Sequence, residues 1–65
     1  MLLHLVELYM RRTRTAPSRF GRDAVGDPRF VFSLRDGREP RPRTREKVIS
    51  FIAAREKDLL SSYGR

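Results

Sequence analysis

Arginine is the residue type that most clearly indicates a chemical role for this chain, because it is abundant and concentrated in one segment. Thirteen of the 65 residues are arginine, and eleven of these lie between positions 11 and 45 against four acidic residues, so this segment alone carries a charge of +7. The ten residues before it carry −1 and the twenty after it carry +1. A guanidinium group donates paired hydrogen bonds to phosphates and to the edges of nucleic-acid bases. A basic centre between nearly neutral ends is therefore typical of a protein that binds a polyanion.

Other kinds of chemistry have little support in the sequence. It has no cysteine and one histidine, His4, so we expect no disulfide, no metal site and no cofactor. No histidine stands in a motif that could activate the hydroxyls of Thr13, Thr15 or Ser18. We therefore expect no catalytic residue, no enzyme activity and no small-molecule ligand, and we expect His4 to lie half-buried on an apolar helix.

The spacing of apolar residues, proline and glycine predicts four helices in one small all-α domain, residues 1–65. Apolar residues at helical spacing indicate a first helix over 2–13. A helix-turn-helix is expected over about 16–36, with Gly26 in its turn and its second helix over 28–36. Prolines at alternate positions of the Arg/Pro connector over 38–43 exclude helix there. Thr44 is expected to cap a last helix over about 44–61.

The helix over 28–36 has marked ends and two distinct faces. Asp27 can accept hydrogen bonds from free amides at its start, Pro28 suits its first position, and Gly37 is expected in a left-handed conformation after its end. At 100° per residue, Val31 and Leu34 share the buried face. The other positions divide between the exposed side, with Arg29, Phe32, Ser33 and Asp36, and the borders, with Phe30 and Arg35. An exposed Phe32 is costly unless DNA, Tyr9 or the last helix covers it.

The segment FGRDAVGDPRFVFSLRDG, residues 20–37, resembles the helix-turn-helix core of the lambda-repressor/Cro-like (XRE-type) DNA-binding domains. In that family an apolar and a small residue open the pattern, and an alanine-like position and a tight turn follow. The second helix then has apolar positions three apart and ends in a polar residue and glycine. The matching residues are Phe20, Gly21, Ala24, Asp27, Val31, Leu34, Asp36 and Gly37. Gly21 stands where the family has alanine, and the turn glycine is displaced to Gly26.

The resemblance implies a sequence-specific, double-stranded DNA-binding transcriptional regulator of bacterial or phage type, with the helix over 28–36 in the major groove. The family's base-contacting positions fall on Pro28, Arg29, Phe32 and Ser33. Arginine there favours guanine, and phenylalanine can touch a thymine methyl group. Phosphate contacts are expected from the outer face of the preceding helix and from the connector, at Ser18, Arg22, Arg38, Arg41 and Arg43.

Two other functions are compatible with the pattern: non-specific nucleic-acid binding, and a protein-binding adaptor on a helix-turn-helix scaffold. The ordered turn chemistry of residues 26–28 favours sequence-specific binding over the first, because charge alone would not need it. The charge of residues 11–45 favours DNA binding over the second. For the arginines of the connector, the alternative to phosphate contact is that they belong to a stiff, solvated linker.

The last helix has more apolar residues than one small core needs. The surplus predicts a homodimer joined mainly through Ile49, Leu60 and Tyr63. The apolar start of the chain, about ten residues long, is shorter than the roughly 20 residues of a membrane span. Its arginines follow the apolar run instead of preceding it, unlike those of a secretory signal. We therefore expect a cytoplasmic, nucleoid-associated protein with no membrane partner.

Overall fold

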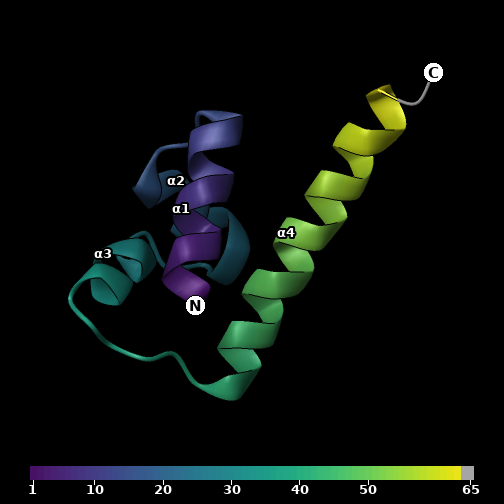
Figure 1. The fold of residues 1–65 in the computed structure, drawn as a ribbon. Coiled ribbons are helices and arrows are strands. Elements are labelled where there is room, and N and C mark those ends of the chain that lie inside the picture. Colours follow the sequence, from purple (N-terminus) through teal and green to yellow (C-terminus); the bar gives the residue numbers. More distant parts are fainter. Residues whose placement is uncertain (64–65) are drawn as a thin grey trace.

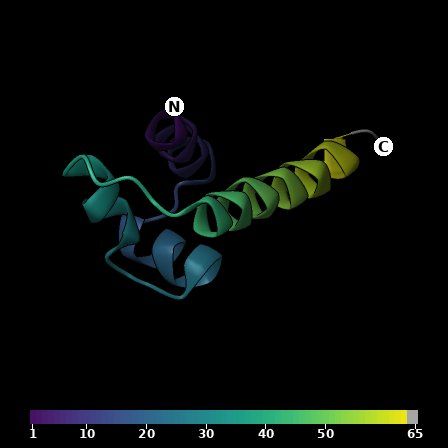
Figure 2. The ribbon, with the colours of Figure 1, turned by 90° about the horizontal axis from the view of Figure 1, so that it is seen from below.

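In the computed structural model, which describes the backbone of residues 1–63 and the side chains of residues 1–56, the chain forms four helices and, within these residues, no strand. The helices are α1 (Leu2–Thr13), α2 (Pro17–Val25), α3 (Phe30–Arg35) and α4 (Pro42–Tyr63). The predicted all-α class with four helices is confirmed. The first three helices gather on one side, and α4 packs against them while its C-terminal end projects beyond them (Figures 1 and 2).

One hydrophobic cluster joins the four helices. Each helix contributes one apolar side chain without exposed surface: Val6 from α1, Phe20 from α2, Val31 from α3 and Val48 from α4. The other buried apolar residues are Leu2, Tyr9, Met10, Phe30, Leu34 and Ile52. The core therefore lies where all four helices meet, and the predicted burial of Val31 and Leu34 is confirmed.

The burial of Phe30 and of His4 differs from the prediction. Phe30, predicted at the border of its helix, is buried because it lies close to the backbone of Gly21 in α2. His4 is exposed instead of half-buried. It lies two residues from the fully buried Val6, and a step of 200° around a helix leads to the opposite face.

Residues in the left-handed conformation end the first two helices and follow α3. Gly37 (φ 91°) adopts it, as the sequence predicts. Gly26 (φ 74°) adopts it in the predicted turn, and Arg14 (φ 54°) adopts it after α1. The amide of Gly37 donates to the carbonyl of Leu34 (3.0 Å), and the amide of Arg38 donates to that of Ser33 (3.1 Å). This pair of bonds closes the end of α3 and satisfies carbonyls that the helix leaves free.

The start of α3 lies two residues later than predicted. The side-chain Oδ1 of Asp27 accepts a hydrogen bond from the amide of Arg29 (2.9 Å), which lies in the turn before α3. Asp27 therefore does not cap the helix as predicted, and α3 has no side-chain cap. The carbonyl of Asp27 accepts a bond from the amide of Phe30 (3.1 Å), which closes a tight turn. Pro28 and Arg29 therefore form a turn in front of α3 instead of its first two residues.

The start of α4 lies two residues earlier than predicted. The carbonyl of Arg41 accepts the amide of Arg45 (2.9 Å), and Pro42 takes the first helical position. Proline fits there because its missing N–H has no partner in the helix anyway. Within the predicted connector over 38–43, only residues 38–41 are thus outside the helix, and Thr44 lies inside the helix instead of capping it.

The turn between α2 and α3 lies directly against Gly21, in the middle of α2. The amide of Asp27 donates to the carbonyl of Gly21 (3.1 Å). A Cβ atom at position 21 would overlap the carbonyl oxygen of Asp27 and would lie 3.2 Å from the Cβ of Phe30. The structure thus explains why glycine stands where the resembling family has alanine: no side chain fits between α2 and the turn.

We expect Gly21→Ala to lower the free energy of unfolding by about 3 kcal/mol, the upper end for an overpacked site, because the obstructing atom belongs to the backbone. Urea unfolding followed by far-UV circular dichroism measures this loss. Gly37→Ala is the matched control, since nothing surrounds its Cβ position and only its positive φ is unfavourable. That variant should lose about 1 kcal/mol. A loss in Gly21→Ala no larger than in the control would contradict the packing argument.

Candidate nucleic-acid interface

The nine residues predicted to contact DNA all reach the surface. Eight are exposed and fall on three segments: Ser18 and Arg22 on α2, Pro28, Arg29 and Phe32 in the turn and the start of α3, and Arg38, Arg41 and Arg43 after α3. Ser33 is of intermediate exposure, because it follows the buried Phe30 by three residues and so lies on nearly the same side of α3.

The outer face of α3, formed by Arg29, Phe32 and Ser33, is fixed at both ends of the short helix. In front, the turn bonds of Asp27 hold the backbone of Arg29. Behind, the bonds around Gly37 close the last turn. Arg29, Phe32 and Ser33 are thereby presented on a short segment whose backbone is held by hydrogen bonds at both ends.

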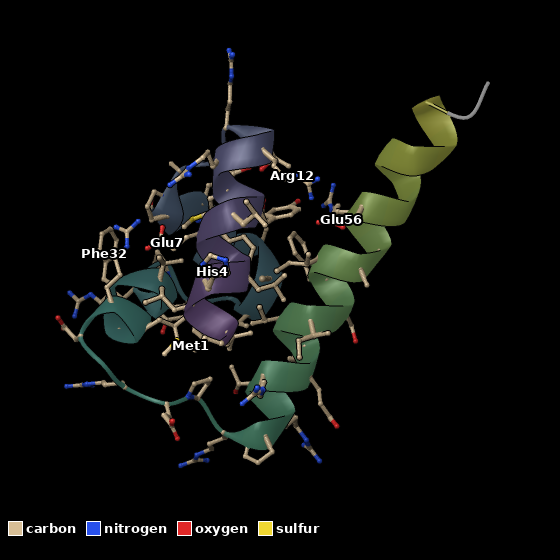
Figure 3. The ribbon with its side chains drawn as sticks, viewed as in Figure 1. Met1, His4, Glu7, Arg12, Phe32 and Glu56 are labelled. Carbon is tan, nitrogen blue, oxygen red and sulfur yellow. The ribbon has the colours of Figure 1, made fainter. Side chains whose placement is uncertain are left out.

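Phe32 presents an apolar ring to solvent. Its exposed fraction is 48%, one of the largest among the large apolar side chains of residues 1–56. Tyr9 does not cover it, because Tyr9 is buried against Phe20 and Phe51. The guanidinium of Arg35 lies 5.9 Å from the centre of the Phe32 ring, within the range of a cation–π contact. Figure 3 shows Phe32 on the side of the molecule away from α4.

Arg35 in turn is held by Glu7 of α1. Its Nε donates to Oε2 of Glu7 and its Nη2 donates to Oε1, both at 2.8 Å. This paired geometry is the strongest arrangement of an arginine and a carboxylate. The hydrogen bonds from Arg35 lower the pKa of Glu7, the nearby charges of Arg35 and Arg11 lower it further, and the pKa of Arg35 is raised by the same pair. The first helix therefore fastens α3 through a side chain that borders its outer face, next to Phe32.

The Glu7–Arg35 pair was not predicted from the sequence. The two residues lie 28 positions apart, and helical periodicity places each of them on its own helix without relating the two helices. The only available indication is that each residue borders the apolar face of its helix, a position from which a long side chain can reach a neighbouring helix.

The arginines divide into paired and unpaired groups. Arg35, Arg12 and Arg19 have carboxylate partners: Glu7, Glu56 of α4 at 3.3 Å, and Asp23 at 3.6 Å. Figure 3 shows Arg12 and Glu56 meeting between α1 and α4. Among the side chains of residues 1–56, no ion pair involves the five arginines predicted to contact DNA, which are Arg22, Arg29, Arg38, Arg41 and Arg43. Their donors are thus open to an external acceptor.

In the described part of the chain, no group of three or more histidine, cysteine or acidic side chains is placed to hold a metal ion. None of its helices combines the length and the apolar character needed to cross a membrane.

Comparison of the chain with protein-family models, with curated proteins and with solved structures found no match.

The Glu7–Arg35 pair predicts a pH dependence of stability. Because the pKa of Glu7 is lower in the folded than in the unfolded chain, the pair stabilises the fold above the ordinary pKa of 4.5 and loses this effect as the pH falls through the lowered value. Glu7→Gln should therefore be less stable than the parent at neutral pH, and the two should converge in acid. Urea midpoints measured from about pH 7 to about pH 3 test this.

Glu56→Gln serves as the control, because it removes one carboxylate from a longer, single-contact pair with Arg12. It should change the midpoints less than Glu7→Gln. A stability difference between Glu7→Gln and the parent that stays constant across the pH range would show that the carboxylate charge is not responsible.

Proposed function

We propose that this protein is a sequence-specific, double-stranded DNA-binding transcriptional regulator of bacterial or phage type. The observation that carries the proposal is the outer face at the start of α3. There Arg29, in the turn before the helix and without an ion-pair partner among the described side chains, stands three residues before the half-exposed ring of Phe32 on a helix fastened at both ends. This combination suits the floor of a major groove, where base edges offer both hydrogen-bond acceptors and thymine methyl groups. The proposed location is the cytoplasm, in association with the nucleoid.

In the proposed complex, α2, the turn over 26–29 and α3 act as a helix-turn-helix, with the start of α3 in the major groove. Arg29 donates to O6 and N7 of a guanine, and Phe32 packs on a thymine methyl group. Pro28 and Ser33 border these contacts. The Glu7–Arg35 pair supports this arrangement, because it holds α3 and lies beside the ring of Phe32.

Phosphate contacts come from the flanking segments. Ser18 and Arg22 lie one turn apart on α2 and are both exposed. Beyond Gly37, Arg38 and Arg41 lie in the segment without secondary structure between α3 and α4, and Arg43 lies in the first turn of α4. Such contacts position the protein on the duplex and carry little sequence information.

The same features weigh against the two alternative functions. A non-specific binder needs only charge, whereas the outer face of α3 combines one arginine with an apolar ring held in place by Arg35. A protein-binding adaptor has no need for five exposed arginines without carboxylate partners among the described side chains. Both alternatives are outcomes of the experiment below.

The decisive experiment is selection of binding sites from random duplexes, followed by affinity measurements on the best site and on random DNA. Arg29→Ala should cost about 1–3 kcal/mol on the best site and much less on random DNA, because it removes a base contact. Arg41 and Arg43 changed together to alanine should weaken both duplexes alike. They should also flatten the dependence of log K on log salt by roughly 0.9 per lost phosphate contact.

The outcomes separate the three functions. Failure to enrich any sequence, with binding retained, indicates non-specific recognition. No binding to duplex DNA at low salt indicates an adaptor. Equal losses of Arg29→Ala on both duplexes would mean that Arg29 touches phosphate only, and an unchanged salt slope in the double variant would make the connector a plain linker.

We further propose that the chain binds an inverted repeat as a homodimer, with half-sites about 34–36 Å apart. Of the three residues proposed for the contact, Ile49 is 43% exposed on α4, an unusual position for isoleucine. The side chains of Leu60 and Tyr63 lie outside the described residues. The homodimer would bring two α3 helices to one duplex and so lengthen the sequence recognised.

Ile49→Glu should abolish the dimer, because a charge replaces apolar surface at the contact. Sedimentation equilibrium at micromolar concentration measures this, and Leu60→Glu should act alike. Ser50→Glu is the matched control, since Ser50 is an exposed neighbour on the same helix outside the proposed contact. A monomeric parent that still binds one half-site per chain would rule the contact out.

A further inference from the structure

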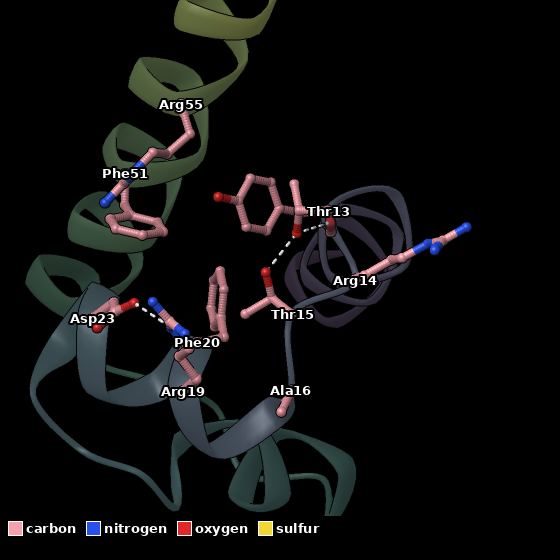
Figure 4. Close-up of a pocket in the computed structure, with 10 residues that line it drawn as sticks. Thr13, Arg14, Thr15, Ala16, Arg19, Phe20, Asp23, Phe51 and Arg55 are labelled. Carbon is pink, nitrogen blue, oxygen red and sulfur yellow. Dashed lines mark hydrogen bonds and ion pairs between the residues drawn. The ribbon is translucent and has the colours of Figure 1, made fainter.

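A cavity of about 640 Å³ lies between the end of α1, the turn that follows it, α2 and the middle of α4. This volume is within the range of small-molecule sites, roughly 300–1,000 Å³. Its principal lining residues are Tyr9, Thr15, Arg19, Phe20, Phe51 and Arg55 (Figure 4). None of them belongs to the nine residues of the proposed DNA contact.

Three aromatic rings from three different helices form the inner wall of this cavity. The ring centres of Tyr9 and Phe20 are 5.5 Å apart, those of Phe20 and Phe51 are 5.6 Å apart, and those of Tyr9 and Phe51 are 6.1 Å apart. The rings are inclined to one another by 59–89°. Tyr9 and Phe20 are buried, whereas Phe51 is partly exposed. A further planar ring can pack edge-to-face on this wall, mainly through Phe51.

Positive charge surrounds the aromatic wall. The lining includes three arginines and one carboxylate, Asp23, so it carries a net positive charge. The guanidinium of Arg55 lies 5.0 Å from the centre of the Phe51 ring. Arg19 shares its charge with Asp23 at 3.6 Å, and Figure 4 shows Arg14 extending away from the three rings. An anion beside Phe51 would therefore find Arg55 as its principal donor.

The hydroxyl of Thr15 offers the cavity an acceptor and no donor. Thr13 Oγ1 donates its single proton to the carbonyl of Tyr9 (2.8 Å). The contact of 2.7 Å between the two threonine hydroxyls must then use the proton of Thr15. A hydroxyl has one proton and two lone pairs, so Thr15 keeps only lone pairs for a ligand. A matching ligand carries an N–H or O–H group.

From this chemistry we propose that the cavity binds an aromatic carboxylate that carries a hydrogen-bond donor on its ring. The ring packs on Phe51 at the aromatic wall, the carboxylate accepts hydrogen bonds from Arg55, and the ring N–H or O–H donates to Thr15. The site is a function beyond DNA binding, and it is testable on the protein without DNA.

The test is a titration of the 65-residue chain with indole-3-acetate, monitored by calorimetry and by amide NMR shifts. Binding is expected, with shifts at Thr15 and Phe51. The N-methyl derivative of the probe, which lacks the ring donor, and its neutral alcohol analogue, which lacks the carboxylate, should each bind about tenfold more weakly or worse. Absence of binding at about 10 mM probe, a concentration at which even millimolar affinity is measurable, overturns the proposal.

Two variants assign the contacts. Arg55→Met should weaken indole-3-acetate by about tenfold, while Arg45→Met, on the same helix outside the cavity, should not. Thr15→Val should abolish the difference between the probe and its N-methyl derivative. Equal effects of the two arginine variants mean general charge attraction and overturn the proposed site. Far-UV circular dichroism verifies that each variant folds, and the NMR shifts of the parent decide the case if one does not.

Discussion

The close approach of α2 to the turn that follows it is the constraint on which the rest of the structure depends. At Gly21 the helix backbone lies against the carbonyl of Asp27 with no room for a side chain. The same turn brings Phe30 beside Gly21 and begins α3. The direction of α3, and with it the exposure of Arg29 and Phe32, therefore follows from one contact between backbone atoms.

Features set by neighbouring residues, such as helix faces and turn glycines, are mostly predictable from the sequence. Contacts between residues far apart in the sequence are mostly not. The burial of Val31 and Leu34, the turn at Gly26 and the left-handed Gly37 follow from spacing and residue type. The starts of α3 and α4 were misplaced by two residues each, because a proline marks a first turn without fixing whether the turn is already helical. In one case the tight turn of Asp27 delays the helix, and in the other Pro42 begins it.

The candidate interface also has features that are predictable from the sequence and features that are not. The exposure of Phe32 and of the arginines follows from the helical wheel and from the prolines of the connector. The pair of Glu7 with Arg35 does not, because it depends on how α1 crosses α3. The aromatic wall of the cavity was missed for the same reason: its three rings come from three helices, so the sequence holds no spacing that relates them.

Arginine serves two purposes in this small protein, and the partner of each side chain tells them apart. Arg35 and Arg12 join α1 to the helices on either side of it, and both are paired with glutamates. Such exposed pairs contribute little energy one by one, but they fix the relative position of helices whose shared core is small. The arginines of the proposed interface lack such partners among the described side chains, so their charge remains available to an external acceptor.

The place of Tyr9 has an optical consequence. The chain has no tryptophan and two tyrosines, and Tyr9 is buried in tilted and edge-on contact with two phenylalanine rings. An asymmetric, rigid surrounding of this kind gives an aromatic chromophore a strong near-ultraviolet dichroism, which disappears when tertiary packing is lost. Tyr9 contacts rings from α2 and α4 and also lines the cavity. The protein thus carries an intrinsic spectroscopic reporter at the junction of three helices, and the closing of its core can be followed without any label.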